Sequence, residues 1–211
     1  MNKYFLSLTI LLLLKICYNI EVGEIIKLPE PKKEGGMPLY EALSKRRSSR
    51  NFDPSIKISL ETLSQALWSC YGIRERTYRT VPSAKSWYNL IVFVFLEDGV
   101  YKYNPGGHLL IKLIDGDHRE MTGTQTALVT KAAVNFVFFG DLKKKTIIAE
   151  EKKKRVVFLD DGHVSMVLSL FAAANDMKGV VRGMVDVDAL KEFLQLKKED
   201  YEFALAFSLG Y

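Results

Sequence analysis

Residues 46–53, RRSSRNFD, place three arginines and two serines in five consecutive positions. Arginine offers a planar fork of N–H donors that matches phosphate oxygens, and serine adds a compact hydroxyl. Side chains four residues apart share one face of a helix, so Arg46 and Arg50 could grip one anion between them. These residues alone leave two interpretations open, a phosphate site or a solvated basic patch.

Other motifs for catalysis or metal binding are missing from the sequence. It contains no Walker loop, no Rossmann glycine fingerprint and no G-x-S-x-G elbow. His108, His118 and His163 are far apart, unlike the ligands of a zinc site. The stretches DGDH (115–118) and DDGH (160–163) combine acids with histidine, but Asp and Gly more often form turns and helix caps. We therefore expect no metal site and no catalytic side chain of these classes.

Length and charge point to one globular domain with a small-molecule ligand. The chain has 211 residues, 48% of them hydrophobic, which is enough for a sizeable core. Its net charge of +5 arises from 30 basic and 25 acidic residues. Such a mixture argues against a nucleic-acid partner, which would require basic residues concentrated on one face, and it is compatible with an anionic small molecule.

The N-terminus has the pattern of an export signal. An apolar run at 4–14 lies between Lys3 and Lys15. It is shorter than the ~20 residues that a helix needs to cross a bilayer, but it fits the apolar region of a secretory signal. We expect residues 1–20 to be a signal peptide and the protein to be periplasmic or held in the cell envelope. A cytoplasmic protein with an N-terminal core helix is the alternative.

The remaining chain divides into an arm and a folded domain. Residues 21–37 are rich in proline, glycine and charge, which predicts a linker or an irregular arm before a domain at 38–211. One short helix is expected to open at Leu39. A second is expected from the N-cap Ser59 to Gly72.

Apolar patterns predict strands in the middle of the domain and a buried helix after them. The runs 89–96 and 134–140 are continuously apolar, as in strands buried on both faces. Residues 160–176 have almost no polar face, so we expect a helix that is buried nearly all round. A charge-rich surface helix or excursion is expected at 141–155, a strand at 179–186 and a final strand from Tyr201. This order predicts the α+β class, with helices around a mixed, largely antiparallel sheet.

Four motifs in order resemble the nitroreductase-like flavoprotein family. They are LYEALSKRRSSRNFD (39–53), RTVPSAKSWYNLIVFVF (79–95), the hairpin GVYKYNPGGH (99–108) and DDGHVSMVLSLFAAANDMKGVVRGMVD (160–186). The turn and the hairpin are most similar to the branch related to SagB-type azoline dehydrogenases. The resemblance covers residues 37–211.

The resemblance implies a three-layer sandwich and an FMN bound at the interface of a homodimer. The residues implied to hold the FMN phosphate and ribityl chain are Arg46, Arg47, Ser48 and Arg50. Those implied to lie along the flavin ring are Pro82, Ser83, Ala84, Lys85 and Ser86. Arg182 and Gly183 are implied to close over the flavin. Lys85, Arg50 and Arg182 are the candidates for a cation near flavin N1.

The implied activity is an FMN-dependent oxidoreductase that uses a flat acceptor such as a nitroaromatic or a quinone. The flavin performs the chemistry, so no catalytic side chain is implied. The electron donor would be NAD(P)H, or an envelope reductant if the protein is exported. Two alternatives remain open, an FMN-binding carrier without turnover and a peptide azoline dehydrogenase.

Overall fold

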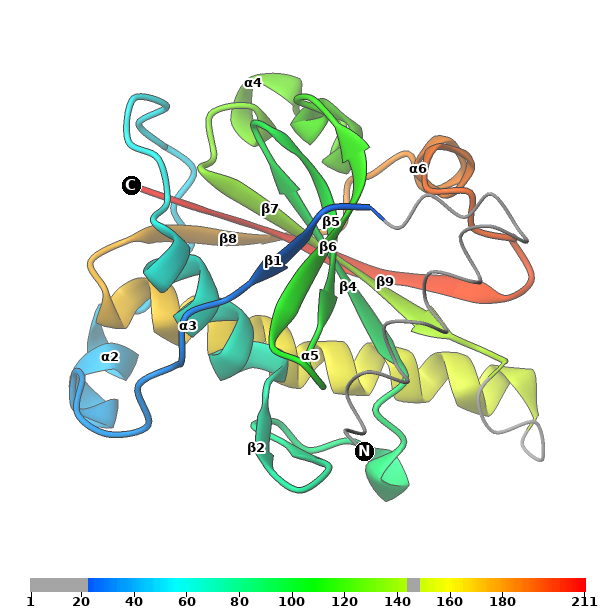
Figure 1. The fold of residues 1–211 in the computed structure, drawn as a ribbon, viewed down its shortest axis with the longest axis horizontal. Coiled ribbons are helices and arrows are strands. Elements are labelled where there is room, and N and C mark those ends of the chain that lie inside the picture. Colours follow the sequence, from blue (N-terminus) through cyan, green and yellow to red (C-terminus); the bar gives the residue numbers. More distant parts are fainter. Residues whose placement is uncertain (1–22, 144–148) are drawn as a thin grey trace, which may run out of the picture.

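The structure is a computed structural model that describes residues 23–143 and 149–211, so the expected signal peptide lies outside the described residues. One seven-stranded sheet forms the centre, in the order β1-β6-β5-β4-β7-β9-β8 (Figure 1). Its strands are β1 (Ile25–Lys27), β4 (Leu90–Leu96), β5 (Gly99–Asn104), β6 (Leu109–Asp115), β7 (Val134–Asp141), β8 (Lys178–Arg182) and β9 (Tyr201–Gly210). Every pairing in it is antiparallel, so the expectation of a mixed sheet is corrected while the α+β class is confirmed.

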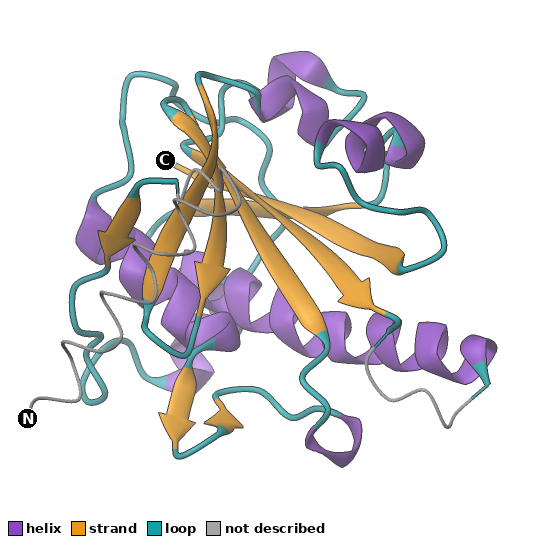
Figure 2. Cartoon of the chain, turned by 45° about the vertical axis from the view of Figure 1, so that its right-hand side comes forward, coloured by secondary structure: helices purple, strands orange, loops and turns teal. Residues whose placement is uncertain are grey.

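Helices cover both faces of this sheet (Figure 2). The helical elements are α2 (Leu39–Lys45), α3 (Leu60–Tyr71), η1 (Ala84–Ser86), η2 (Arg119–Thr122), α4 (Thr126–Val129), α5 (Glu150–Ala174) and α6 (Val187–Phe193). A two-stranded hairpin, β2 (Ile73–Glu75) with β3 (Tyr78–Arg79), follows α3. α3 and α5 pack on one face of the large sheet and α6 packs on the other. The result is three layers.

The central strands carry two apolar faces, as their continuous hydrophobic runs predict. In β4, Val92 and Val94 join the core beneath α3 and α5. Phe93 and Phe95 point to the opposite face and join the core beneath α6. Because successive side chains of a strand alternate between faces, a strand buried on both sides must be apolar throughout.

The second helix is capped as the sequence predicts. The Ser59 hydroxyl accepts a hydrogen bond from Thr62 N at 3.1 Å, and Gly72 ends the helix. Cys70 near its end is fully buried in the core. Burial and the nearby Asp161 carboxylate raise the pKa of Cys70, so the thiol stays protonated and acts as a packing residue.

The long helix α5 differs from its prediction in two ways. It begins at Glu150, ten positions before the expected start, because its first turns are the charged residues 150–155. It is also not buried all round, since Met166 within the predicted range is 42% exposed, and Phe158 and Leu159 in the part before that range are 50% and 55% exposed. Among the described residues α5 is also the one helix long and apolar enough to cross a membrane. Packing against the sheet and α3 accounts for much of that composition.

The segment expected as a linker or an irregular arm is bound to the sheet. Strand β1 pairs with β6, and Leu28 behind it is buried. His108 helps to hold this arm, because its imidazole lies 3.2 Å from the carbonyl oxygen of Pro29 and 2.7 Å from the Ser64 hydroxyl. In its described part the segment is therefore an arm and not a linker.

Candidate functional site

The arginine cluster is an extended segment that runs beside β8. Helix α2 ends at Lys45, and the backbone of Arg46 leaves the helical region with a ψ of 123°. The N–H of Ser49 then donates to the carbonyl of Gly179 at 3.0 Å. Arg46 and Arg50 therefore do not share a helical face, and that part of the sequence interpretation is wrong.

A basic cleft lies where this segment meets the start of β8. We use this name for the cavity of about 650 Å³ lined by Ser44, Lys45, Arg46, Arg47, Ser49, Ala173, Asp176, Met177 and Lys178. Lys45 is bound to Glu41 at 3.0 Å, which raises the pKa of Lys45. Within the described ranges Arg46, Arg47 and Lys178 form no ion pair, so three cations remain to attract an anion.

A smaller hollow lies at the other end of β8. It has a volume of about 190 Å³ and is lined by Arg50, Gln125, Val181, Arg182, Gly183 and Met184. Four residue steps along β8 separate Lys178 in the cleft from Arg182 here, or about 13 Å. The structure thus brings Arg46, Arg47 and Lys178 to one end of β8 and Arg50 with Gly183 to the other.

Arg182 is buried, and its guanidinium points into the protein. Its Nη1 donates to the carbonyl of Thr122 at 2.6 Å, and its Nε donates to the Ser208 hydroxyl at 2.8 Å. Nη2 donates to Thr122 Oγ1 and to Asn135 Oδ1, both at 3.3 Å. No carboxylate in the described part of the chain pairs with it, and burial lowers the pKa of Arg182 to about 10.

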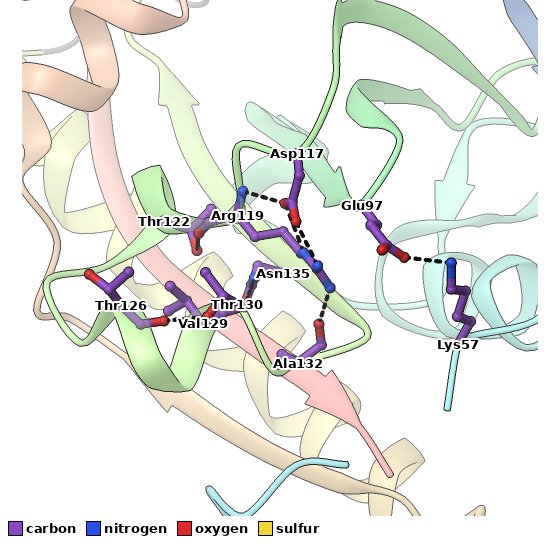
Figure 3. Close-up of polar contacts among 10 residues, drawn as sticks. All are labelled: Lys57, Glu97, Asp117, Arg119, Thr122, Thr126, Val129, Thr130, Ala132 and Asn135. Atoms are coloured by element: carbon purple, nitrogen blue, oxygen red, sulfur yellow. Dashed lines mark hydrogen bonds and ion pairs between the residues drawn. The ribbon is translucent and has the colours of Figure 1, made fainter. Parts of the chain in front are cut away.

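The polar partners of Arg182 belong to a network of hydrogen bonds around η2 and β7. Figure 3 shows Thr122 at the end of η2 and Asn135 on β7, with the Asn135 amide donating to the carbonyl of Val129 at 2.8 Å. Arg119 supports the same network through Asp117 and through the carbonyl of Ala132 at 2.9 Å. Arg182 is therefore bonded into the framework while it also lines the hollow, and its contact with a flavin, which the resemblance implies, stays a prediction.

The turn 82–86 lies apart from both cavities, against the middle of α5. The Ser83 hydroxyl donates to Asp160 Oδ2 at 2.5 Å, and the N–H of Ala84 donates to Asp160 Oδ1 at 3.3 Å. Ala173, which lines the basic cleft, is 13 positions further along the same helix, or about 20 Å. Within one chain, the arginine cluster and this turn therefore do not face the same space.

Two contributors to these sites are absent from the sequence prediction. Lys178 completes the basic cleft, and its position directly before the expected strand was a usable signal. Asp160 belongs to DDGH, which we interpreted as a turn or a cap, but α5 continues through it. Its contact with Ser83 joins residues 77 positions apart, and nothing in the local sequence predicts such a pairing.

Comparison with known proteins relates the chain to nitroreductases. A curated protein of Methanocaldococcus jannaschii, provisionally assigned as the nitroreductase MJ1384, is 28% identical over 84% of this chain and 93% of its own length. The crystal structure of a provisionally assigned nitroreductase from Ralstonia eutropha JMP134 is 30% identical, covers 88% of each chain and gives a TM-score of 0.81.

More distant solved structures share the fold. The Escherichia coli microcin synthetase complex McbBCD aligns with 92% of this chain and 79% of the matched chain, at 16% identity and a TM-score of 0.71. A provisionally assigned nitroreductase from Exiguobacterium sibiricum, solved with FMN, aligns with 85% and 90% at 18% identity and a TM-score of 0.63. Residues 43–211 match the Nitroreductase family directly. The chain is a member of the nitroreductase family.

Proposed function

We propose that this protein is an FMN-dependent oxidoreductase that passes electrons to a flat acceptor such as a nitroaromatic or a quinone. The observation that carries the proposal is the basic cleft beside β8. Its cations Arg46, Arg47 and Lys178 face a cavity of about 650 Å³ together with the residues Ser44 and Ser49. Arginine forks and hydroxyls suit a phosphate group, and the family relation supplies FMN as the phosphate ligand.

The second hollow provides room for the other end of an elongated ligand. Arg50 and Gly183 are exposed there, beside Arg182, which lies about 13 Å along β8 from Lys178. A Cβ built on Gly183 would meet only Leu205, at 3.8 Å, so the chain itself does not require glycine at this position. Glycine leaves space for a flat group to approach the backbone. When bound, FMN supplies the redox chemistry, and these residues bind it and place positive charge beside it.

We further propose that a second copy of the chain completes the site. The turn 82–86 lies about 20 Å along α5 from the basic cleft, so it could line the same ligand only from another subunit. Exposed apolar side chains offer contact surfaces for that copy, namely Leu39 and Tyr40 on α2 and, separately, Phe158, Leu159 and Met166 on α5. Large exposed apolar patches mark association surfaces.

Mixed dimers test this shared site. One variant would lack the phosphate ligands (Arg46→Ala with Arg47→Ala), and the other would carry a disrupted turn (Ser83→Pro with Ala84→Pro). Each homodimer should bind FMN poorly, whereas refolded mixtures should recover up to about one quarter of the wild-type sites, because half of the dimers are hybrid and each has one intact site. Mixtures that recover nothing would contradict a site built from two copies.

The activity is tested first by an absorption spectrum of purified residues 22–211. Bands near ~375 and ~450 nm would identify an oxidised flavin. NADH, NADPH and then dithionite are added without oxygen, and a nitroaromatic or a quinone follows. Bleaching by a nicotinamide and recovery with an acceptor would support the oxidoreductase. A colourless protein that also takes up no added FMN would overturn the proposal.

Related measurements separate the oxidoreductase from the FMN carrier and from the azoline dehydrogenase. A flavin that is reduced only by dithionite would favour an FMN carrier, or an envelope donor such as a quinol. Oxidation of an azoline peptide would favour the azoline dehydrogenase, which the shared fold of the microcin synthetase makes a relevant second candidate. We keep export as a proposal that rests on residues 1–20, and fractionation of cells that express the full chain tests it.

A further inference from the structure

The turn after β3 has an unusual backbone for its sequence. Lys85, Ser86 and Tyr88 have positive φ angles of 51°, 54° and 46°, and none of them is glycine. Side chains with a Cβ seldom adopt this left-handed conformation, so something must hold it. Left-handed residues that are this close together identify a segment whose shape is imposed from outside.

Asp160 provides that hold from the middle of α5. Its two carboxylate oxygens accept from the Ser83 hydroxyl at 2.5 Å and from the N–H of Ala84 at 3.3 Å. The same Ser83 oxygen accepts from the N–H of Tyr88 at 3.0 Å. One carboxylate thereby fixes the first residues of the turn directly and its last residue through Ser83. Asp160 is 3% exposed, which shields these bonds from competing water.

The neighbouring residue shows that acidity alone does not explain this contact. Asp161 is also buried, but its two carboxylate oxygens have no hydrogen-bond partner within the described residues. One position along a helix turns the side chain by about 100°. Asp160 thus faces the turn and Asp161 faces the core near Cys70. The pair offers a matched comparison within one helix.

We propose that Asp160 is a positioning residue, which fixes the turn 83–88 and through it the contacts that this turn offers to the flavin ring. This inference rests on the proposed function, in which the turn lies along the ring. It also reassigns Ser83, whose hydroxyl is engaged with Asp160 and Tyr88. The groups left to meet a flat ligand are then Pro82, the methyl group of Ala84, Lys85 and Ser86.

The hold on the turn is tested without any flavin, using Trp87 within the turn as a reporter. A Trp68→Phe background leaves Trp87 as the only tryptophan. Asp160→Ala and Ser83→Ala should each raise acrylamide quenching of Trp87 about twofold, because both release the turn, and the double variant should add little. Asp161→Asn is the control and should leave quenching unchanged. The proposal would be overturned if Asp160→Ala and Asp161→Asn changed Trp87 quenching equally. It would also be overturned if neither Asp160→Ala nor Ser83→Ala changed it.

The effect of Asp160 on flavin affinity is tested by titration with FMN and with riboflavin, which lacks the phosphate. Asp160→Ala should lower the affinity for both FMN and riboflavin about tenfold, because the ring end of the site is altered. Unchanged riboflavin affinity would contradict the proposal. If Asp160→Ala does not fold, Ser83→Ala removes the same bond from the surface side and is judged by the same criteria. If the wild type binds neither compound, the FMN assignment fails, while Trp87 quenching still decides whether Asp160 holds the turn.

Discussion

The two ends of β8 carry positive charge in opposite ways. At its start, Lys178 and the arginines of the basic cleft face a cavity, and they form no ion pair within the described parts of the chain. At its end, Arg182 is buried and bonded to Thr122, Asn135 and Ser208. The first arrangement suits a ligand, because its donors remain available. The second suits a framework, because nearly all of its donors are already used.

The largest expected effect falls on the buried end. Arg182→Met removes hydrogen bonds from Thr122, Asn135 and Ser208 and should lower the free energy of unfolding by about 3–4 kcal/mol. Chemical denaturation measures this loss, and Arg182→Lys should give an intermediate value because lysine keeps the charge but not the fork. Wild-type stability combined with lost flavin binding would make Arg182 a ligand contact instead.

At the start of β8, substitutions in the basic cleft should lower FMN affinity and leave the stability of the protein nearly unchanged. Arg46→Ala with Arg47→Ala should weaken FMN binding about 100-fold, or about 3 kcal/mol, since two phosphate ligands are lost. The free energy of unfolding should change by less than about 0.5 kcal/mol, because surface cations contribute little to stability. Fluorescence titration measures the affinity. The control Lys32→Ala with Lys33→Ala removes two exposed cations from the arm and should leave the FMN affinity unchanged.

Asp161 is a buried acid whose carboxylate has no hydrogen-bond partner within the described residues, in contrast to the hydrogen-bonded Arg182. Burial raises the pKa of Asp161 from 3.8 to about 7. The folded protein therefore keeps a proton that the unfolded chain has already released, so the contribution of Asp161 to the free energy of unfolding is greatest below about pH 4 and falls as the pH rises towards 7. Asp161→Asn should remove this slope and be about 2 kcal/mol more stable than the wild type at pH 8. Parallel pH profiles of unfolding for the two proteins would contradict this account.

The smallest effect is expected at Gly183. Since an added Cβ would meet only Leu205, at 3.8 Å, Gly183→Ala should leave the thermal midpoint of the protein without flavin nearly unchanged. FMN binding should weaken by about 1 kcal/mol because the methyl group enters the space in the hollow. Equal FMN affinity in both proteins would remove the hollow from the site. Gly106→Ala, on the distant β5–β6 turn, is the control substitution.

Local patterns predicted most of the fold because its strongest signals are local. The alternating faces of Val92 and Phe93 follow from the pleat of a strand, and the Ser59 cap follows from one hydroxyl near the N–H of Thr62. The sequence predicted a charge-rich helix or excursion at 141–155 and a separate buried helix from 160. It missed that residues 150–155 open the same helix α5, because they are charged and carry no apolar period. Charged residues form helices readily when the rest of the helix packs on a core.

The site was harder to predict because its geometry is set across the chain. The arginine cluster was found by residue type, but its assumed helical pairing was wrong, since α2 ends at Lys45. The inward orientation of Arg182 depends on Thr122, which lies 60 positions earlier. Likewise, Asp160 reaches Ser83 only because α5 packs beside the turn. Contacts of this kind depend on the assembled layers and leave no mark in a short motif.

The most direct test of the account compares FMN with riboflavin in binding to the wild-type protein. The two ligands share the flavin ring and differ by the phosphate that the basic cleft is proposed to hold. We predict that FMN binds about 100-fold more tightly and that added salt narrows the difference by screening the cations. Equal affinity for the two ligands would contradict a phosphate site at Arg46, Arg47 and Lys178.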